Sequence, residues 1–337
     1  MGLSCLHHVS IVGAMYGFHP NPETEMAKKA IAVATEHYGD HPDLDLLFFW
    51  IDNAVDGGAK EYLQRAIKSP HRHVRGNALQ TLASMYAAEA RVPSLFDANL
   101  KLLRRNPEKN AAAISRYSQL RERWKTDPQA ARVAALRLFV EVVEQYADVL
   151  ESPRTNYGPV LLKVSRGPTD ELTEQKRRTL GKLAEAAQFE LTNLTIGQVA
   201  PEIAGEDAFG QELMLSAHRG KVVVVMFSFK GCGPCEAMYP DNRKLLEQYK
   251  GRPFIILGVM GDPTVATVKE VVQEGKITWP VWWDGGIRGP ITSRWNVKGW
   301  PEIYVLDHHG VIRYRELSSD LLALAVPELV EEAEKGP

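Results

Sequence analysis

Residues 221–235 read Lys-Val-Val-Val-Val-Met-Phe-Ser-Phe-Lys-Gly-Cys-Gly-Pro-Cys, and this segment is the most informative about the fold of the C-terminal part of the chain. Its first nine residues form a nearly continuous β-branched and apolar run, which is typical of a strand buried on both faces. Gly233-Pro234 then indicates a helix that runs to about residue 249, because proline is favoured in the first helical turn. The sequence therefore predicts a buried strand, a short turn and a helix, with two cysteines where the helix begins.

Cys232 and Cys235 are suited to redox chemistry at this position. A thiolate at a helix N-terminus is stabilised by unpaired backbone N–H groups and by the helix dipole, which lowers its pKa from about 8.5 toward 7 or below. Two cysteines separated by two residues can also close a disulfide with little backbone movement. We expect Cys232, the more exposed of the two, to attack a disulfide, and Cys235, one turn deeper, to resolve the mixed disulfide.

Other uses of the cysteines fit the sequence less well. A zinc site needs two further ligands, and the chain has one other cysteine, Cys5, and no second cysteine pair. A purely structural disulfide that closes so short a loop would constrain the unfolded chain little. We therefore predict a catalytic pair that needs neither a metal nor another cofactor, and we expect Cys5 to be an inert or lipid-bearing terminal residue.

Strand and helix patterns alternate after residue 197. After the strand over 221–229, the patterns predict a strand over Phe254–Met260 and a helix over 263–275. They then predict a hairpin of two short strands, over 303–307 and 311–314, and a closing helix over 319–334. This order predicts an α/β domain in which helices cover a sheet.

The N-terminal part has helical patterns throughout, with proline or acidic residues at several of the expected helix starts. The first expected helix begins at residue 22, and the others cover 43–55, 59–68, 71–91, 107–125, 128–150 and 172–189. The helix over 71–91 is expected to stop before Pro93. Short linkers between such helices predict stacked helical hairpins. We therefore expect two domains: an all-α helical-hairpin domain over 21–190, with an irregular connector at 152–168, and the α/β domain over 191–337. Residues 1–20 are assigned to neither.

The composition is that of a globular chain without a strong charge bias. The 337 residues are 45% apolar and 24% charged, with a net charge of −2, so they carry no global signal for nucleic acid or an anionic membrane. The longest strongly apolar run, over 222–227, is far shorter than the ~20 residues of a transmembrane helix. Residues 3–18 are mildly apolar but have no Lys or Arg ahead of them, which makes a poor export signal unless the true start lies upstream.

Residues 194–334 resemble a thioredoxin-fold domain, and they are most similar to the TlpA/ResA-like branch of extracytoplasmic thiol–disulfide oxidoreductases in the redoxin, or AhpC-TSA, superfamily. The resemblance is carried by four stretches in this order: Gly-Gln-Val-Ala-Pro-Glu at 197–202, Leu-Ser-Ala-His-Arg-Gly-Lys-Val at 215–222, Cys-Gly-Pro-Cys at 232–235 and Val-Lys-Gly-Trp-Pro-Glu-Ile-Tyr-Val-Leu-Asp at 297–307. It implies an enzyme that exchanges disulfides with disulfide-bearing or dithiol protein partners, usually as a reductant, and that has an upstream electron donor. We therefore expect the cell envelope or periplasm, with the cytoplasm as the alternative because no clear export signal is present.

The resemblance also implies a substrate loop. Gly299-Trp300-Pro301 falls where the family places a cis-proline loop beside the redox pair. Pro301 has no N–H to donate, which leaves neighbouring backbone groups free to meet an extended substrate. Trp300 is the best candidate for a substrate-facing aromatic residue, whereas interior packing is expected of Trp279, Trp282, Trp283 and Trp295.

Three positions depart from the family pattern. Gly231 stands where a tryptophan usually precedes the first cysteine, Met238 where a glutamate often follows the second, and Met226 where a buried carboxylate or amide is common. No residue is therefore assigned to proton transfer at Cys235. Lys230 can stabilise the thiolate electrostatically, although a solvated lysine is the simpler expectation.

Two other functions stay open at this point. Peroxide reduction is suggested by the opening at 197–201, which peroxiredoxins share, but it needs a threonine near the attacking cysteine, and Phe229 occupies the position three before Cys232. Alternatively, the helical domain recognises a protein partner and the α/β domain serves as a dock. The leading expectation is a thiol–disulfide oxidoreductase whose helical domain determines the choice of partner.

Overall fold

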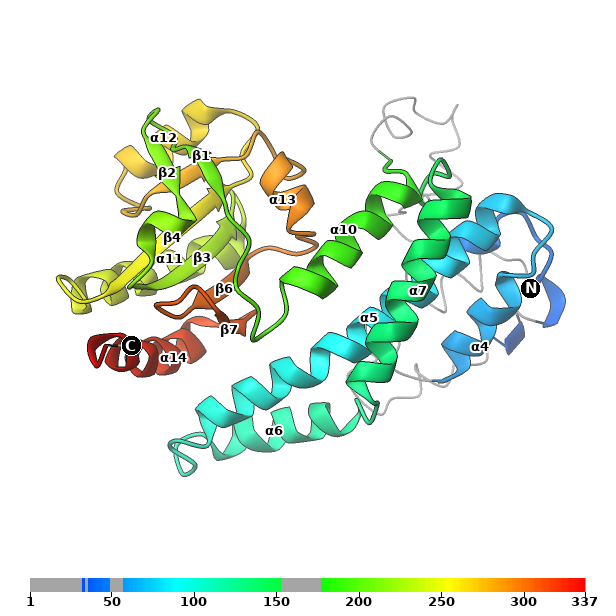
Figure 1. The fold of residues 1–337 in the computed structure, drawn as a ribbon, viewed down its shortest axis with the longest axis horizontal. Helices are drawn as coiled ribbons and strands as arrows, with labels where there is room; N and C mark the ends of the chain where they lie inside the picture. Colours follow the sequence, from blue (N-terminus) through cyan, green and yellow to red (C-terminus); the bar gives the residue numbers. More distant parts are fainter. Residues whose placement is uncertain (1–31, 34–35, 49–56, 153–176, 337) are drawn as a thin grey trace. The chain divides into compact units, whose positions relative to one another are not determined.

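The computed structural model describes residues 32–33, 36–48, 57–152 and 177–336 of the chain (Figure 1). The chain divides into two compact units, the first made of residues up to 90 with 126–188 and the second made of 91–125 with 189–337. The start of the first predicted helix and residues 153–168 of the predicted connector lie outside the described residues. No helix in the described part of the chain is long and apolar enough to cross a membrane.

Helices form the core of the first unit. They are α4 (Gly57–Ala66), the first part of α5 (Arg72–Leu103), α7 (Pro128–Tyr146) and the first part of α10 (Leu180–Asn193). Helix α7 begins where the sequence predicts it, because the Asp127 carboxylate accepts the N–H groups of Gln129 and Ala130 and Pro128 occupies the first turn. The apolar residues that pack together include Leu44, Phe48, Tyr62, Leu63, Val74, Ala78 and Leu82.

The prediction that a helix stops before Pro93 is wrong, since α5 continues through Pro93 to Leu103. A proline inside a helix removes the hydrogen bond to the carbonyl four residues earlier, at a cost of about 3 kcal/mol. Here that carbonyl, on Glu89, accepts a hydrogen bond from the Thr126 hydroxyl at 3.4 Å. The extra turns bury Leu102 and Leu103, so tertiary packing outweighs the local preference.

Helix α10 begins at Leu180, and residues 177–179 before it are not helical although the predicted helix covers them; the first residues of that prediction, 172–176, lie outside the described residues. Thr179, the residue before it, forms an isolated antiparallel bridge with Leu150. The Leu180 N–H donates to the carbonyl of Val149 at 2.7 Å. This backbone pairing keeps Thr179 out of the helix.

A five-stranded sheet forms the centre of the second unit. Its strand order is β5-β4-β3-β6-β7, with bounds Val281–Trp283, Phe254–Met260, Val222–Ser228, Glu302–Leu306 and Ile312–Arg315. Strands β3, β4 and β5 are parallel to one another, whereas β6 is antiparallel to both β3 and β7. The predicted mixture of an all-helical N-terminal part and an α/β C-terminal domain is therefore confirmed at the level of fold class.

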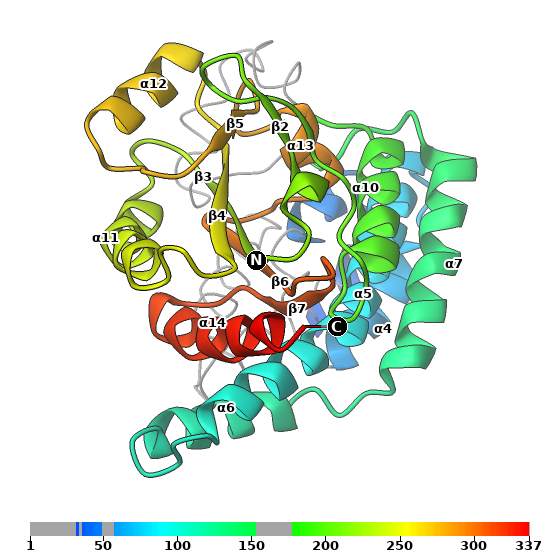
Figure 2. The same cartoon turned by 60° about the vertical axis from the view of Figure 1, so that its left-hand side comes forward.

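Strand β3 is buried on both faces, as its apolar run predicts. Alternate residues from Val222 pack against α11 (Gly233–Gln248) and α14 (Ser319–Glu334). Those from Val223 pack on the opposite face, in a cluster that contains Trp282, Trp295 and Tyr304. Figure 2 shows α11 and α14 side by side, and residues of the two helices contact each other.

Several short elements of the second unit were not predicted from the sequence patterns. They are the short hairpin β1 (Ala204–Glu206) and β2 (Glu212–Met214), strand β5, the 3-10 turn Leu215–His218 and α13 (Pro290–Arg294). Each has five residues or fewer, which is too short for a period to be visible. The remaining helix of this part, α12 (Val265–Gln273), lies within its predicted range.

A helical hairpin from the N-terminal part groups with this second unit. It consists of the end of α5 and of α6 (Ala111–Glu122), which lies inside its predicted range. Leu102 and Leu103 join the apolar cluster of α11 and α14, and Lys101 and Arg105 both pair with Glu328. The predicted boundary at 190/191 assigns these residues to the helical domain, so the compact units divide the chain differently from that prediction.

Candidate redox site

Cys232 and Cys235 form a disulfide at the first turn of α11. The S–S distance is 2.00 Å and the two Cα atoms lie 5.2 Å apart. Cys232 is the N-cap of the helix, and its Sγ accepts the N–H of Cys235 at 3.3 Å. Cys232 is 6% exposed and Cys235 is fully buried, so solvent reaches the residue expected to attack and not the one expected to resolve.

The turn between β3 and the disulfide depends on Gly231. Its φ angle of +89° lies in the region that residues with a side chain rarely adopt, which gives a physical reason for glycine at this position. The Gly231 N–H donates to Oε1 of Glu236 at 2.8 Å. The carboxylate of Glu236 therefore reaches back over the start of α11 and fixes the residue that precedes Cys232.

The Trp300–Pro301 peptide bond, at the start of β6, is cis, as the family resemblance implies. The Trp300 ring packs edge-on against the Phe229 ring with centroids 5.3 Å apart. It also lies over Gly261, where an added Cβ would come within 2.8 Å of the ring. The structure thus brings Trp300 together with the turn that leads to Cys232, while the substrate-binding role of Trp300 and Pro301 stays a prediction.

Asp262, a buried carboxyl at the same edge of the sheet, was not predicted from the sequence. It follows strand β4 and is 1% exposed. One carboxylate oxygen accepts the Lys230 N–H at 3.1 Å, and the other, within the described residues, has no hydrogen-bond partner. Burial raises the pKa of Asp262 above its ordinary value. Its position directly after strand β4 could have identified it from the sequence, because polar residues that follow parallel strands gather at one edge of the sheet.

The departures from the family pattern have structural counterparts. Met226 is fully buried, and its sulfur lies 3.2 Å from the side-chain amide nitrogen of Asn242. Met238 is 8% exposed and packs in the apolar cluster of α11. Neither residue can exchange a proton with Cys235.

Lys230 has an acidic partner outside the disulfide. Its ammonium pairs with Glu270 at 2.9 Å, and about a third of its side chain is exposed. The structure therefore pairs Lys230 with a carboxylate, which is neither of the two roles considered from the sequence.

The tryptophans behave largely as the sequence predicts. Trp279, Trp282 and Trp295 are buried, whereas Trp283 is 39% exposed. The Trp283 indole N–H donates to the carbonyl of Asp262 at 2.8 Å, which ties the end of β5 to the loop after β4. Among the described residues, no group of three or more His, Cys, Asp or Glu side chains is arranged to hold a metal ion.

A CxxC pair between the central strand and the following helix, in a sheet of this order, defines the class of thioredoxin-fold thiol–disulfide oxidoreductases. The family model of the AhpC/TSA family matches residues 196–315.

Two curated relatives extend the comparison. ResA of Geobacillus kaustophilus (strain HTA426), a thiol-disulfide oxidoreductase, is 30% identical over 125 residues, which are 37% of this chain and 70% of the relative. ResA of Bacillus thuringiensis subsp. konkukian (strain 97-27) is 29% identical over 119 residues, which are 35% of this chain and 68% of the relative. The chain belongs, through its C-terminal domain, to the ResA-like family of thiol–disulfide oxidoreductases.

Solved structures give one further comparison. The thioredoxin domain of a thiol-disulfide oxidoreductase from Bacteroides vulgatus is 31% identical, with a TM-score of 0.38, and the match covers 41% of this chain and 99% of that domain.

Proposed function

We propose that this chain exchanges disulfides with partner proteins through Cys232 and Cys235. The observation that carries the proposal is the disulfide itself, which forms at the N-terminus of α11 with its first cysteine at the cap and its second buried. The first cysteine can meet a partner at the surface. The second is held one turn away, where it can reach the first but not the solvent.

The reductive direction balances as two exchanges. The Cys232 thiolate attacks one sulfur of the partner disulfide, which forms a mixed disulfide and releases the other partner sulfur as a thiolate. Cys235 then loses its proton and attacks Sγ of Cys232, which closes the intramolecular disulfide and releases the second partner thiolate. The partner gains two electrons, and with two protons from solvent and the Cys235 thiol it becomes a dithiol. An upstream dithiol donor returns two electrons to Cys232 and Cys235.

Helix α11 supports the first step. In the reduced protein, a Cys232 thiolate would lie at the cap of a helix of 16 residues, where the unpaired N–H groups stabilise negative charge. The Cys235 N–H, which points to Sγ of Cys232 in the disulfide, is one such donor. This stabilisation favours attack by Cys232 at neutral pH.

Trp300 and Pro301 form the proposed substrate loop. An extended partner segment would lie along this loop, with its disulfide directed to Cys232. The support is local: Trp300 packs on Phe229, three residues before Cys232, and over Gly261 at the end of the neighbouring strand. By family resemblance we place the reaction in the cell envelope, and fractionation of cells producing the full-length protein tests this against the cytoplasm.

Trapping of the mixed disulfide tests the proposed function. Reduced Cys235→Ser, mixed with insulin as a disulfide substrate, should accumulate a covalent adduct that dithiothreitol releases, and Cys232→Ser should form none. Cys5→Ser is the matched control and should reduce insulin like the wild type. Rapid consumption of hydrogen peroxide without adduct formation would support the peroxidase alternative. A helical partner-binding module without exchange chemistry predicts neither result.

A further inference from the structure

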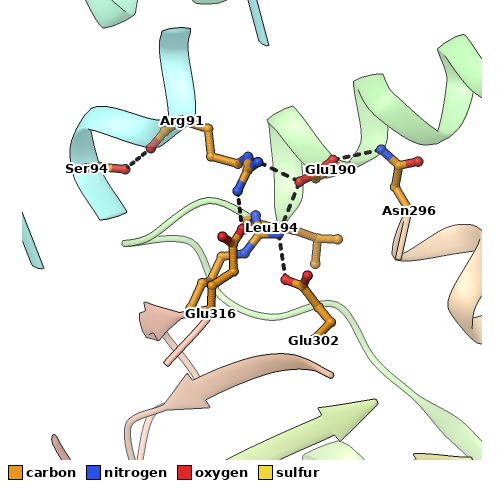
Figure 3. A network of polar contacts seen from close by, with 8 residues as sticks. Arg91, Ser94, Glu190, Leu194, Asn296, Glu302 and Glu316 are labelled. Carbon is orange, nitrogen blue, oxygen red and sulfur yellow. Dashed lines mark hydrogen bonds and ion pairs between the residues drawn. The ribbon is translucent and has the colours of Figure 1, made fainter. Parts of the chain in front are cut away.

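Five charged side chains pair with one another near the end of α10 and beside strands β6 and β7, and four of them are labelled in Figure 3. We call them the charged cluster, and they are Arg91, Glu190, Glu302, Arg315 and Glu316. All five belong to the second compact unit. The cluster is well shielded at its centre, since the Arg315 and Glu190 side chains are 3% and 11% exposed.

Arg315 holds the centre of the cluster. One of its guanidinium nitrogens lies 3.1 Å from Oε1 of Glu190 and 3.1 Å from Oε1 of Glu302. Another donates to the carbonyl of Leu194 at 2.8 Å. Arg315 therefore joins the end of α10 to the first residue of β6, which directly follows Pro301.

The second oxygen of Glu190 holds the other end of the same loop. The side-chain amide of Asn296 donates to Oε2 of Glu190 at 2.7 Å. Asn296 is 6% exposed and has a φ angle of +52°, in the left-handed region that asparagine tolerates better than most residues. Residues 297–301, which include Trp300 and Pro301, thus lie between two residues that Glu190 fixes, one directly and the other through Arg315.

Electrostatics favours an ionised Glu190 in this position. Burial opposes its charge, but Arg91 and Arg315 more than compensate, and the pKa of Glu190 is held at about 2. Arg91, on α5, lies 3.5 Å from Glu190 and also pairs with Glu316. Removal of one charge from such a cluster leaves buried partners uncompensated, which is more disruptive than loss of an exposed ion pair.

We propose that Glu190 is a positioning residue that holds the Trp300–Pro301 loop in its substrate-binding conformation. This rests on the proposed function, in which that loop meets the partner protein. Glu190 lies on α10, outside the segment 196–315 that the family model matches. A helix preceding the thioredoxin-like fold therefore contributes to the redox site without touching the cysteines, through Asn296 at one end of the loop and Glu302 at the other.

Two variants test the proposal in the full-length oxidised protein. Glu190→Gln removes the charge while it keeps the shape, and Asn296→Asp tolerates the same backbone but places a carboxylate against Glu190. Hydrogen exchange of the peptide covering 297–301 should rise at least about tenfold in both, because the loop loses one of its anchors. Glu328→Gln is the matched control: its side chain is 13% exposed and pairs with Arg105, yet it lies on α14 and bonds to no residue of the loop.

Kinetics with insulin gives the second measurement. Both variants should raise KM for insulin several-fold, with little change in kcat or in the reduction potential of Cys232 and Cys235, and Glu328→Gln should change none of these. Unchanged loop exchange in folded Glu190→Gln and Asn296→Asp would overturn the proposal, and so would an equal rise in Glu328→Gln. An inactive wild type with increased loop exchange in both variants would instead overturn the proposed function and leave the positioning role in place.

Discussion

Replacement of Gly231 by alanine should destabilise the protein through the backbone alone. The φ angle of Gly231 is +89°, and a Cβ added there would meet no atom within 4 Å. The substitution therefore creates no clash and deletes no contact, and the Gly231 N–H can still donate to Glu236. The left-handed conformation costs a residue with a side chain roughly 1–2 kcal/mol, and we expect this loss in the free energy of unfolding.

Gly233 provides the matched control. It is also open, with no atom within 4 Å of an added Cβ, but it is the first residue of α11 and its φ angle is not positive. Alanine is a better helix former than glycine by up to about 1 kcal/mol, while Pro234 disfavours a helical residue with a Cβ before it, so Gly233→Ala should change the free energy of unfolding little.

Urea unfolding of the oxidised proteins, followed by tryptophan fluorescence, gives the free energy of unfolding of each variant. The m-values should equal that of the wild type, so that a shift in midpoint reports a change in stability. A Gly231→Ala variant within about 0.3 kcal/mol of the wild type would refute the reasoning, given that exposed substitutions without such strain usually change stability by less than about 0.5 kcal/mol. An equal loss in Gly233→Ala would refute it as well, because that residue carries no positive φ angle.

Three further outcomes follow from the site. Because burial raises the pKa of Asp262, its charged form opposes folding at neutral pH. Asp262→Asn should therefore raise Tm at pH 7 by about 2 °C or more. Thermal unfolding at several pH values should show this gain fade as the pH falls toward 4. The pKa of Glu190 is lowered to about 2, so the ionised carboxylate stabilises the fold above about pH 4.5, and this stabilisation is lost as the pH falls toward 2. The loss of stability in Glu190→Gln should therefore be largest at pH 7 and shrink from pH 4.5 toward 2. A difference in stability that does not change with pH would contradict the assignment. Gly261→Ala places a Cβ 2.8 Å from Trp300, and it should raise KM for insulin without a change in reduction potential.

The centre of the C-terminal domain could be predicted because local and tertiary preferences agree there. The apolar run of β3 is buried on both faces, and α11 begins at the glycine and proline that the sequence places there. Strand β4 and helix α14 likewise have their expected bounds. A buried strand followed by a helix with two cysteines needs no long-range information to be identified.

The parts that could not be predicted depend on contacts between residues far apart in the sequence. Helix α5 passes Pro93 because burial of Leu102 and Leu103 outweighs the local preference, and the Thr126 hydroxyl donates to the carbonyl that proline leaves unpaired. Glu190 and Arg315 are separated by 125 positions, so neither segment alone identifies their ion pair. Asp262 looks like an ordinary loop residue until β3 and β4 are placed side by side. Sequence patterns therefore locate the redox pair but not the polar groups around it.

The central claim is that Cys232 and Cys235 are one reversible redox couple, and a count of free thiols across a graded glutathione series tests it most directly. The wild type should show a single transition of two thiols, and Cys232→Ser should show none. A midpoint near about −270 mV would mark a reductant and one near about −120 mV an oxidant. Absence of a two-thiol transition in the wild type, or its persistence in Cys232→Ser, would contradict the account.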